Sequence, residues 1–221
     1  GNAVLNRAVR PRANDEYLKN IFDIFAPDFE QVLTGLDYRA PELIRGLLEE
    51  IYGSKKSPRL RILDAGCGTG FCGGFLKKYS SFRGLYGVDI SEKMLEQAQA
   101  KKVYSHLLQS ELEQYFSQAK TKFDLIVSAD VFTYFGSLEK LLSGMADSLS
   151  AGGRVIFTVS ENNLNDDDYF LHSSGRYLHH QNYVGKVLEK AGFEVEKLER
   201  AKLRNEGENI VYGYVVSALK K

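Results

Sequence analysis

The sequence has no surplus of charge of either sign, because 29 Lys and Arg residues balance 29 Asp and Glu residues over 221 positions. Proteins that hold a phosphate backbone usually carry a basic surplus, so the composition argues against a nucleic-acid partner. The chain also has no apolar run near the roughly 18 residues of a membrane span, and its N-terminus lacks the pattern of a signal peptide. We therefore expect no membrane partner. The sequence gives no signal for an oligomeric state.

Cysteine and proline are scarce as well. The two cysteines, Cys67 and Cys72, lie five positions apart in a glycine-rich stretch. One close pair in a chain of this length is not a disulfide framework, so a reducing, cytoplasmic setting is expected. We interpret both as small neighbours of the glycines rather than as redox groups, because no adjacent base is evident. Four prolines and 43% hydrophobic residues indicate one folded domain with appendages rather than a disordered chain.

Strand-like and helix-like segments alternate through most of the chain. The strand-like runs are apolar and bounded by turn residues, and they cover 59–64, 84–89, 105–108, 123–128, 154–159, 193–198 and 209–218. The helical segments have apolar residues at helical spacing, and they cover 71–79, 91–101, 112–119, 138–149 and 183–191. Ser91 is a good N-cap for the second of these. The last two strands are expected to form a hairpin.

The remaining segments are predicted to flank the sheet. Residues 15–51 read as several helices broken near Pro27 and Pro41, and the polar segment 53–58 reads as a turn. The polar stretch 161–168 has no periodicity and reads as an insertion. We therefore divide the chain into an N-terminal helical cap, 1–58, and a main domain, 59–221, with a substrate-side insertion at 161–182. The aromatic residues Phe22, Phe25 and Phe29 are expected to belong to the core.

Alternating strands and helices predict an α/β protein with a doubly wound, mostly parallel seven-stranded sheet, a C-terminal antiparallel hairpin and an N-terminal helical cap. Such sheets bind ligands at the carboxyl ends of their strands. The strongest motif lies at such an end: Ile62-Leu-Asp-Ala-Gly-Cys-Gly-Thr-Gly70 is a strand that releases Asp64 and three glycines before a helix. Glycine lets the backbone approach a ligand, and a helix N-terminus offers free N–H groups. Asp89 ends the next strand, where a carboxylate can accept both hydroxyls of a ribose.

Two other interpretations of this motif remain. Glycine-rich turns also occur for packing, and aspartates at strand ends often cap helices. Gly68-Thr-Gly-Phe-Cys-Gly73 also fits GxGxxG, the dinucleotide fingerprint, which would indicate a nicotinamide or flavin cofactor. In that fingerprint the first glycine follows the strand immediately, whereas here Asp64 and Gly66 come first. The position favours a nucleoside site over a dinucleotide site.

With these residues in view, the sequence resembles the class I S-adenosylmethionine-dependent methyltransferases, with a Rossmann-like fold. The glycine-rich motif and the ribose-binding acid of that family are matched by Asp64, Gly66, Gly68, Gly70 and Asp89. The segments 123–130 and 149–157 resemble its fourth strand and its turn into the fifth. The flanks 28–43 and 175–179 are similar to those of a bacterial subgroup described as TPR-repeat-containing methyltransferases. No such repeat is present, although residues 3–11 could be the tail of one in a longer chain.

The resemblance implies roles residue by residue. Asp64 and the three glycines would hold the methionine part of S-adenosylmethionine, Asp89 the ribose, and Ile90 would lie against the adenine. Glu111, with Leu112 beside it, would accept from the adenine amino group, or it would simply be an acid at a helix start. Tyr17 would close over the cofactor, as N-terminal helices do in similar proteins.

The acceptor side has weaker signals. After the fourth strand, Asp130 and Tyr134 would face the substrate, although Tyr134 could equally be an ordinary half-buried aromatic. Arg176 could pair with a substrate carboxylate or phosphate, or cap a helix. His179 could act as a base near neutral pH or make a structural hydrogen bond. Neither the spacing of the histidines nor the cysteines suit a closed zinc site, and no metal is expected.

These inferences predict methyl transfer from S-adenosylmethionine to a small-molecule nucleophile by in-line displacement. The absence of a catalytic triad is compatible with this reaction, because the sulfonium already activates its methyl group and the protein mainly aligns the reactants. Two alternatives from other classes stay open at this point. One is a nicotinamide-dependent oxidoreductase, and the other is a non-catalytic module that binds S-adenosylmethionine.

Overall fold

The computed structural model describes residues 11–53 and 58–221. The expected repeat tail at 3–11 and the expected turn at 53–58 therefore fall almost entirely outside the described residues. Within the described ranges, every helix is too short or too polar to cross a membrane.

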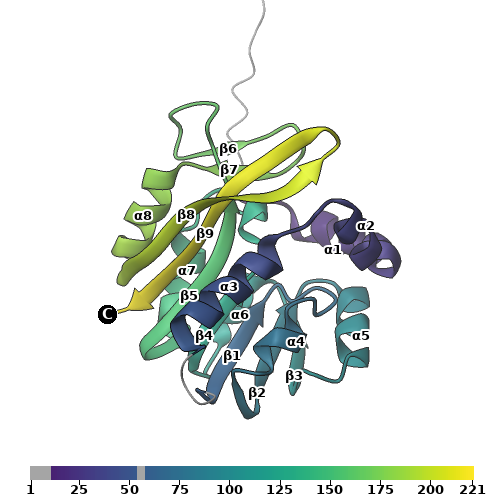
Figure 1. Ribbon diagram of the computed structural model, residues 1–221, viewed down its shortest axis with the longest axis vertical. Helices are drawn as coiled ribbons and strands as arrows, with labels where there is room; N and C mark the ends of the chain where they lie inside the picture. Colours follow the sequence, from purple (N-terminus) through teal and green to yellow (C-terminus); the bar gives the residue numbers. More distant parts are fainter. Residues whose placement is uncertain (1–10, 54–57) are drawn as a thin grey trace, which may run out of the picture.

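A seven-stranded sheet forms the centre of the molecule, in the order β3-β2-β1-β4-β5-β9-β8 (Figure 1). The first five strands in this order, β3 to β5, run parallel to one another, whereas β9 is antiparallel to both β5 and β8. This topology confirms the predicted Rossmann-like α/β fold with its C-terminal antiparallel hairpin. The strands are β1 Leu60–Ala65, β2 Ser80–Asp89, β3 His106–Gln109, β4 Phe123–Ser128, β5 Leu149–Ser160, β8 Phe193–Glu206 and β9 Asn209–Lys220.

Helices cover both faces of this sheet, because both faces of its central strands are apolar. Along β1, Ile62 packs into the cluster under one face and Leu63 into the cluster under the other. Two helices, α3 and α4, cover the first face, and three, α6 to α8, cover the second. Their bounds are α3 Ala40–Tyr52, α4 Gly73–Leu76, α6 Leu112–Gln118, α7 Glu139–Ser148 and α8 Gln181–Lys190. A further helix, α5 Glu92–Ala100, follows β2 and is capped by Ser91, which accepts from the Met94 N–H as predicted.

Three helices of the expected N-terminal cap, 1–58, lie beside the sheet and are called the cap below, whereas α3 packs on the sheet itself. They are α1 Asp15–Phe25, the short 3-10 helix Ala26–Asp28 and α2 Phe29–Gly35. Pro27 lies in the 3-10 turn between α1 and α2, and Pro41 lies in the first turn of α3, so both prolines mark helix boundaries as expected. Figure 1 shows α1 and α2 together at one side of the molecule, above α5.

Several segments differ from the sequence-based expectation, and β2 and β5 also begin four to five residues earlier than expected. The helix expected over 71–79 is only four residues long in the structure, as α4, and its two adjacent glycines lower the helix propensity. Within the insertion expected over 161–182, the stretch 161–168 is irregular as expected, whereas residues 169–179 form a two-stranded sheet that the sequence did not indicate, β6 Tyr169–Leu171 with β7 Tyr177–His179. The hairpin strands β8 and β9 are both longer than expected. The added part of β8, residues 199–206, is mostly charged or polar, so the apolar pattern in the sequence stops before that strand does.

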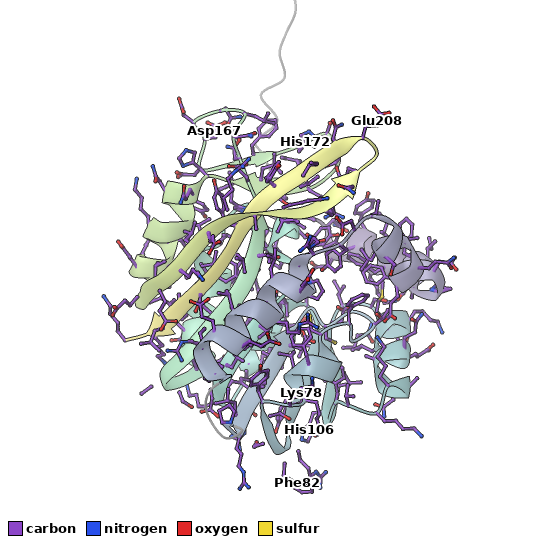
Figure 2. The ribbon with its side chains drawn as sticks, viewed as in Figure 1. Lys78, Phe82, His106, Asp167, His172 and Glu208 are labelled. Atoms are coloured by element: carbon purple, nitrogen blue, oxygen red, sulfur yellow. The ribbon has the colours of Figure 1, made fainter. Side chains whose placement is uncertain are left out.

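The tip of the β8–β9 hairpin reaches the segment between α2 and α3 (Figure 1). The Asn205 N–H donates to the Leu36 carbonyl at 2.7 Å, and the Arg39 N–H donates to the Leu203 carbonyl at 2.8 Å. The pairing register of β8 shifts between Lys202 and Arg204. Such an irregularity re-aims side chains, and here Leu203 and Arg204 are both buried although they are consecutive. Figure 2 places Glu208 at this tip and His172 nearby, at the end of the molecule opposite Phe82.

Candidate active site

A cavity of about 370 Å³ lies at the carboxyl ends of β1, β2 and β4, under α1 and α2. Among the residues singled out from the sequence, those that line it are Tyr17, Asp64, Gly66, Gly68, Asp89, Ile90, Glu111, Leu112, Asp130, Tyr134 and Arg176. Gly70 and His179 do not line it. Parallel strands place their carboxyl ends at one edge of the sheet, which explains how residues so far apart in the sequence meet.

In the glycine turn after β1, some glycines are required by packing and one leaves room for a ligand. All three glycines have positive φ, at +76° for Gly66, +52° for Gly68 and +83° for Gly70. A Cβ on Gly66 would lie 2.3 Å from a methyl carbon of Val131, and one on Gly70 would lie 2.9 Å from the ring of Tyr104. A Cβ on Gly68 would meet only a ring carbon of Phe29, at 3.8 Å. Packing therefore requires glycine at the first and last positions, whereas Gly68 leaves its backbone open to the cavity.

Asp64 is the most deeply buried carboxyl group of the cavity wall, with 2% of its surface exposed. Burial raises its pKa to about 7, and a hydrogen bond of 2.6 Å from the Tyr104 hydroxyl opposes that shift. Tyr104 comes from the loop before β3 and was not singled out from the sequence. A carboxyl group with such a pKa gains from a nearby cation, because a positive charge favours its ionised form.

Asp89 is held by the backbone at the end of β2. One carboxylate oxygen accepts from the Gly68 N–H at 2.8 Å, and the other accepts from the Ser91 N–H at 2.9 Å. Burial raises the pKa of Asp89. A carboxylate offers about four acceptor positions. The Ile90 N–H also acts on this carboxylate and favours its ionised form. The acceptor positions that remain would suit neighbouring hydroxyl groups of a ligand.

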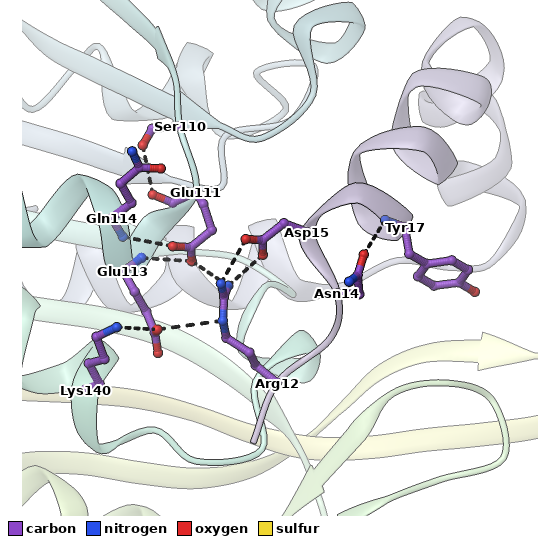
Figure 3. A network of polar contacts seen from close by, with 9 residues as sticks. All are labelled: Arg12, Asn14, Asp15, Tyr17, Ser110, Glu111, Glu113, Gln114 and Lys140. Atoms are coloured by element: carbon purple, nitrogen blue, oxygen red, sulfur yellow. Dashed lines mark hydrogen bonds and ion pairs between the residues drawn. The ribbon is translucent and has the colours of Figure 1, made fainter. Parts of the chain in front are cut away.

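Glu111 lines the cavity, but its carboxylate is occupied by the start of α6 (Figure 3). It accepts from the Glu113 N–H at 2.9 Å and from the Gln114 N–H at 2.8 Å, and it forms an ion pair with Arg12 at 3.0 Å. These contacts are those of an acid at a helix start, one of its two expected roles. Arg12 also holds both oxygens of Asp15 and thereby ties the beginning of α1 to α6.

The cap is fastened to the turns on which Asp89 and Gly68 lie. The Ser91 hydroxyl donates to the Asp23 carboxylate at 2.6 Å, and the Thr69 hydroxyl donates to the Glu30 carboxylate at 2.6 Å. Lys101 of the α5 end also binds Glu30. Tyr17 lines the cavity yet keeps 59% of its surface exposed, so it lies at the mouth.

The aromatic residues of the cap do not join the core, contrary to expectation. Phe22, Phe25 and Phe29 line the cavity, and Phe25 is half exposed. Phe22 meets the ring of Tyr134 edge-on, with 5.4 Å between ring centroids. Helical spacing in the sequence identified the apolar face of this segment, but it could not tell a face that packs on the sheet from one that roofs a cavity.

The end of the cavity beyond β4 is built from charged and phenolic groups. Asp130 has a positive φ of 56° and its N–H donates to the Thr158 hydroxyl. Its carboxylate lies 3.2 Å from Arg176 and 3.3 Å from Arg204. Burial raises the pKa of Tyr134 to about 12, so its hydroxyl stays protonated near neutral pH. Arg204 was not found from the sequence, because it lies beyond the apolar part of β8.

The position of His179 does not suit the general base that was predicted for it. The side chain is fully buried, and its Nε2 contacts the carbonyl oxygens of Phe135 at 2.8 Å and Gly136 at 3.1 Å. Nε2 therefore carries the hydrogen, and Nδ1 has no partner among the described residues. Burial lowers the pKa of His179 to about 4. The structure supports the alternative expectation of a structural hydrogen bond.

The fold defines a Rossmann-like domain with a cavity at the carboxyl ends of its strands. Comparison with protein families adds that residues 63–157 match the Methyltransf_11 family, described as a methyltransferase domain. The matched region contains the glycine turn, Asp89, Glu111 and Asp130.

Curated relatives resemble parts of the chain. Human methyltransferase-like protein 27 is 41% identical over 88 residues, which are 40% of this chain and 35% of that protein. The malonyl-[acyl-carrier protein] O-methyltransferase of Priestia megaterium is 26% identical over 151 residues, 67% of this chain and 53% of the relative. The chain therefore spans about a third to a half of the length of these relatives.

Solved structures resemble almost the whole chain. The magnesium protoporphyrin IX methyltransferase of Synechocystis PCC 6803, with bound SAH, has a TM-score of 0.73 at 19% identity, covering 94% of this chain and 100% of that one. The 1,6-didemethyltoxoflavin-N1-methyltransferase of Burkholderia thailandensis, with S-adenosylhomocysteine and its substrate bound, has a TM-score of 0.68 at 20% identity, covering 96% and 93%. At such identities the likeness establishes the fold.

Proposed function

We propose that this protein transfers a methyl group from S-adenosylmethionine to a small-molecule acceptor. The observation that carries the proposal is the pairing of Asp89 with the Gly68 N–H at 2.8 Å on the wall of the cavity. It places an acceptor carboxylate beside a backbone segment that has no side chain in the way. The match of residues 63–157 to a methyltransferase domain supports the same reading.

The residues present fit the proposed cofactor. The remaining acceptor positions of Asp89 suit the ribose hydroxyls, and Ile90 and Leu112 offer apolar surface to an adenine ring. Asp64 offers a buried carboxylate to the positively charged methionine part, and the open backbone at Gly68 admits close approach. Glu111 could reach the adenine amino group only in addition to its present contacts with α6.

S-adenosylmethionine, when bound, would supply an electrophilic methyl group on a sulfonium. The protein's part is to bind, orient and exclude water. Asp64 and Asp89 fix the two ends of the ligand, and the aromatic cap residues keep bulk water from the transfer path. The protonated Tyr134 hydroxyl can donate a hydrogen bond to the acceptor, and Asp130 and Arg176 form the polar wall that the acceptor meets.

The segments that would contact the acceptor are assigned from their position around the cavity. The N-terminal segment 1–58 and the insertion 161–182 would form the substrate side, since both supply lining residues such as Phe22 and Arg176. The narrower assignment to the bacterial TPR-repeat-containing subgroup is supported by the flanks 28–43 and 175–179 alone.

Calorimetry with S-adenosylhomocysteine and with NAD tests the cofactor. We expect S-adenosylhomocysteine to bind and NAD to bind at least about a hundredfold more weakly, because the site offers one ribose carboxylate and one open glycine. Binding of NAD alone would favour the oxidoreductase and end the proposal.

Transfer itself is tested with S-adenosylmethionine that carries a labelled methyl group, mixed with a metabolite extract. Label that moves to a small molecule supports the enzyme. Binding of S-adenosylhomocysteine without any transfer would favour the non-catalytic module instead. The variant Glu92→Ala, on the exposed side of α5, serves as a matched control for changes at Asp89.

A further inference from the structure

Four charged side chains form a line of alternating sign at the acceptor end of the cavity. Glu206 accepts two hydrogen bonds from Arg204, at 2.7 and 3.1 Å. Arg204 then contacts Asp130 at 3.3 Å, and Asp130 contacts Arg176 at 3.2 Å. Arg204 is almost completely buried, with 3% of its side chain exposed, so this line is anchored inside the protein and ends at Arg176.

Arg176 ends the line with half of its guanidinium group open. Its Nη1 atom makes both contacts with Asp130, at 3.2 and 3.4 Å. Within the described ranges, no hydrogen bond engages its Nε or Nη2 atom, and neither atom is among the buried donors without a partner. The side chain lines the cavity and is 23% exposed. The open edge is therefore accessible from the cavity.

The other arginine on the cavity wall differs in this respect. Arg12 binds both oxygens of Asp15, at 2.7 and 2.9 Å, and also pairs with Glu111 at 3.0 Å and Glu113 at 3.7 Å (Figure 3). Its charge is thus already matched by three carboxylates. Of the two arginines lining the described cavity, Arg176 is the one with hydrogen-bond donors left for a ligand.

We propose that the methyl acceptor carries a carboxylate, which binds the Nε–Nη2 edge of Arg176 and extends the alternation of charges by one member. This inference rests on the proposed methyltransferase function and names the substrate class of the same site. A guanidinium edge with two parallel donors matches the two oxygens of a planar carboxylate. The cap residues nearby are apolar and aromatic, with Phe22 against Tyr134, so the rest of the acceptor is apolar.

The charge balance favours a monoanion over a phosphate dianion. Glu206 and Asp130 carry two negative charges, and Arg204 and Arg176 carry two positive ones, so the line is neutral as it stands. A dianion would meet the Asp130 carboxylate with no surplus of positive charge to balance it. A carboxylate adds one negative charge at the open cationic end.

The test uses the full chain saturated with S-adenosylhomocysteine and two acids with apolar bodies, 3-phenylpropanoate and hexanoate. Each acid is paired with its primary amide, and 3-phenylpropyl phosphate is included as the dianion. Calorimetry should give at least about a tenfold tighter binding for each acid than for its amide, because a charge-assisted bidentate pair is lost in the amide. The phosphate should bind no better than the acid.

Variants then locate the effect. Arg176→Met should bring the ratio of acid to amide affinity close to one, and Arg176→Lys should recover only part of it, because lysine keeps the charge but loses the planar fork. Arg200→Met is the matched control. Arg200 also pairs with a carboxylate, Glu161, but it lies outside the cavity, so the ratio should be unchanged.

Several outcomes would overturn the proposal. They are equal binding of acids and amides, a preference for acids that survives in Arg176→Met, tighter binding of the phosphate, or no binding of either acid at millimolar concentration.

A different outcome is that the open edge of Arg176 holds the carboxylate of the cofactor itself. In that case Arg176→Met would weaken S-adenosylhomocysteine at least about tenfold while leaving 5′-methylthioadenosine, which lacks that carboxylate, unaffected. If S-adenosylhomocysteine failed to bind the wild type, the proposed methyltransferase function itself would be refuted.

Discussion

The buried carboxyl group of Asp64 predicts that cofactor affinity depends on pH in a range where ordinary aspartates do not titrate. Its pKa is raised to about 7 by burial, so in the free protein at pH 6 most Asp64 side chains are protonated. A ligand with a positively charged methionine part binds the ionised form. Binding below the pKa must therefore release a proton, and the affinity should fall as the pH falls.

The magnitude follows from this pKa. Between pH 7.5 and pH 5.5 the dissociation constant of S-adenosylmethionine should rise roughly 25-fold, whereas an aspartate of ordinary pKa would give almost no change. Calorimetry at pH 6.5 in two buffers of different ionisation enthalpy should detect the release of about 0.8 proton for each ligand bound. Below pH 7.5 the amino group of the ligand stays largely protonated and does not obscure the result.

Two variants separate Asp64 from other titrating groups. Tyr104→Phe removes the 2.6 Å hydrogen bond that lowers the pKa of Asp64, so the midpoint of the pH dependence should move upward. Asp64→Asn should remove the dependence and weaken binding at pH 7.5. Tyr115→Phe, a tyrosine of α6 outside the cavity, is the control and should leave the midpoint in place. A dissociation constant that is flat from pH 5.5 to 7.5 in the folded wild type would refute the assignment of Asp64.

Further predictions concern the ribose site, the cap and the buried histidine. Asp89→Ala should weaken S-adenosylhomocysteine by about 2–4 kcal/mol, or roughly 30-fold or more by calorimetry, and unchanged affinity in a folded variant would exclude the ribose role. Glu30→Gln weakens the partly exposed contact with Thr69 and should speed cofactor dissociation about two- to threefold in stopped-flow experiments, with equal rates counting against the cap. The folded-state pKa of His179, about 4, lies below its unfolded value near 6.5, so stability should be lost as the pH falls through that window. In urea titrations at pH 7.5 and 4.5, this loss should be about 2–3 kcal/mol larger in the wild type than in His179→Gln, and parallel losses would contradict it.

The cofactor side of the site could be predicted because its determinants are local in sequence. A buried strand, the glycines that follow it and the acid at the end of the next strand all lie within 62–89. Parallel pairing of β1 with β2, in which Ala65 pairs with Val88, then brings Asp89 to the glycine turn without help from distant segments. Tyr104 escaped prediction because nothing in its own segment indicates that its hydroxyl reaches Asp64.

Where the role of a residue depends on packing between distant segments, the sequence named the residue but not its role. Glu111 sits at a helix start, and only the approach of Arg12 shows that its carboxylate is already engaged. His179 lies in a polar stretch that suggested a pocket, yet the β6–β7 pairing turns it toward the carbonyl of Phe135. Both outcomes depend on contacts between residues more than 40 positions apart.

At the acceptor end of the cavity, the sequence indicated even less of the arrangement. Asp130 follows β4 and Arg176 lies in the loop before β7, but the residue that anchors them, Arg204, comes from a strand whose length the apolar pattern understated. Its side chain turns inward because the register of β8 shifts between Lys202 and Arg204, and the hairpin tip is held in place by backbone bonds to the segment before α3. The ion pair with Asp130 therefore depends on three segments that meet only in the folded protein. The proposed specificity for the acceptor would thus depend on this tertiary arrangement, whereas the proposed cofactor site depends mainly on one short motif.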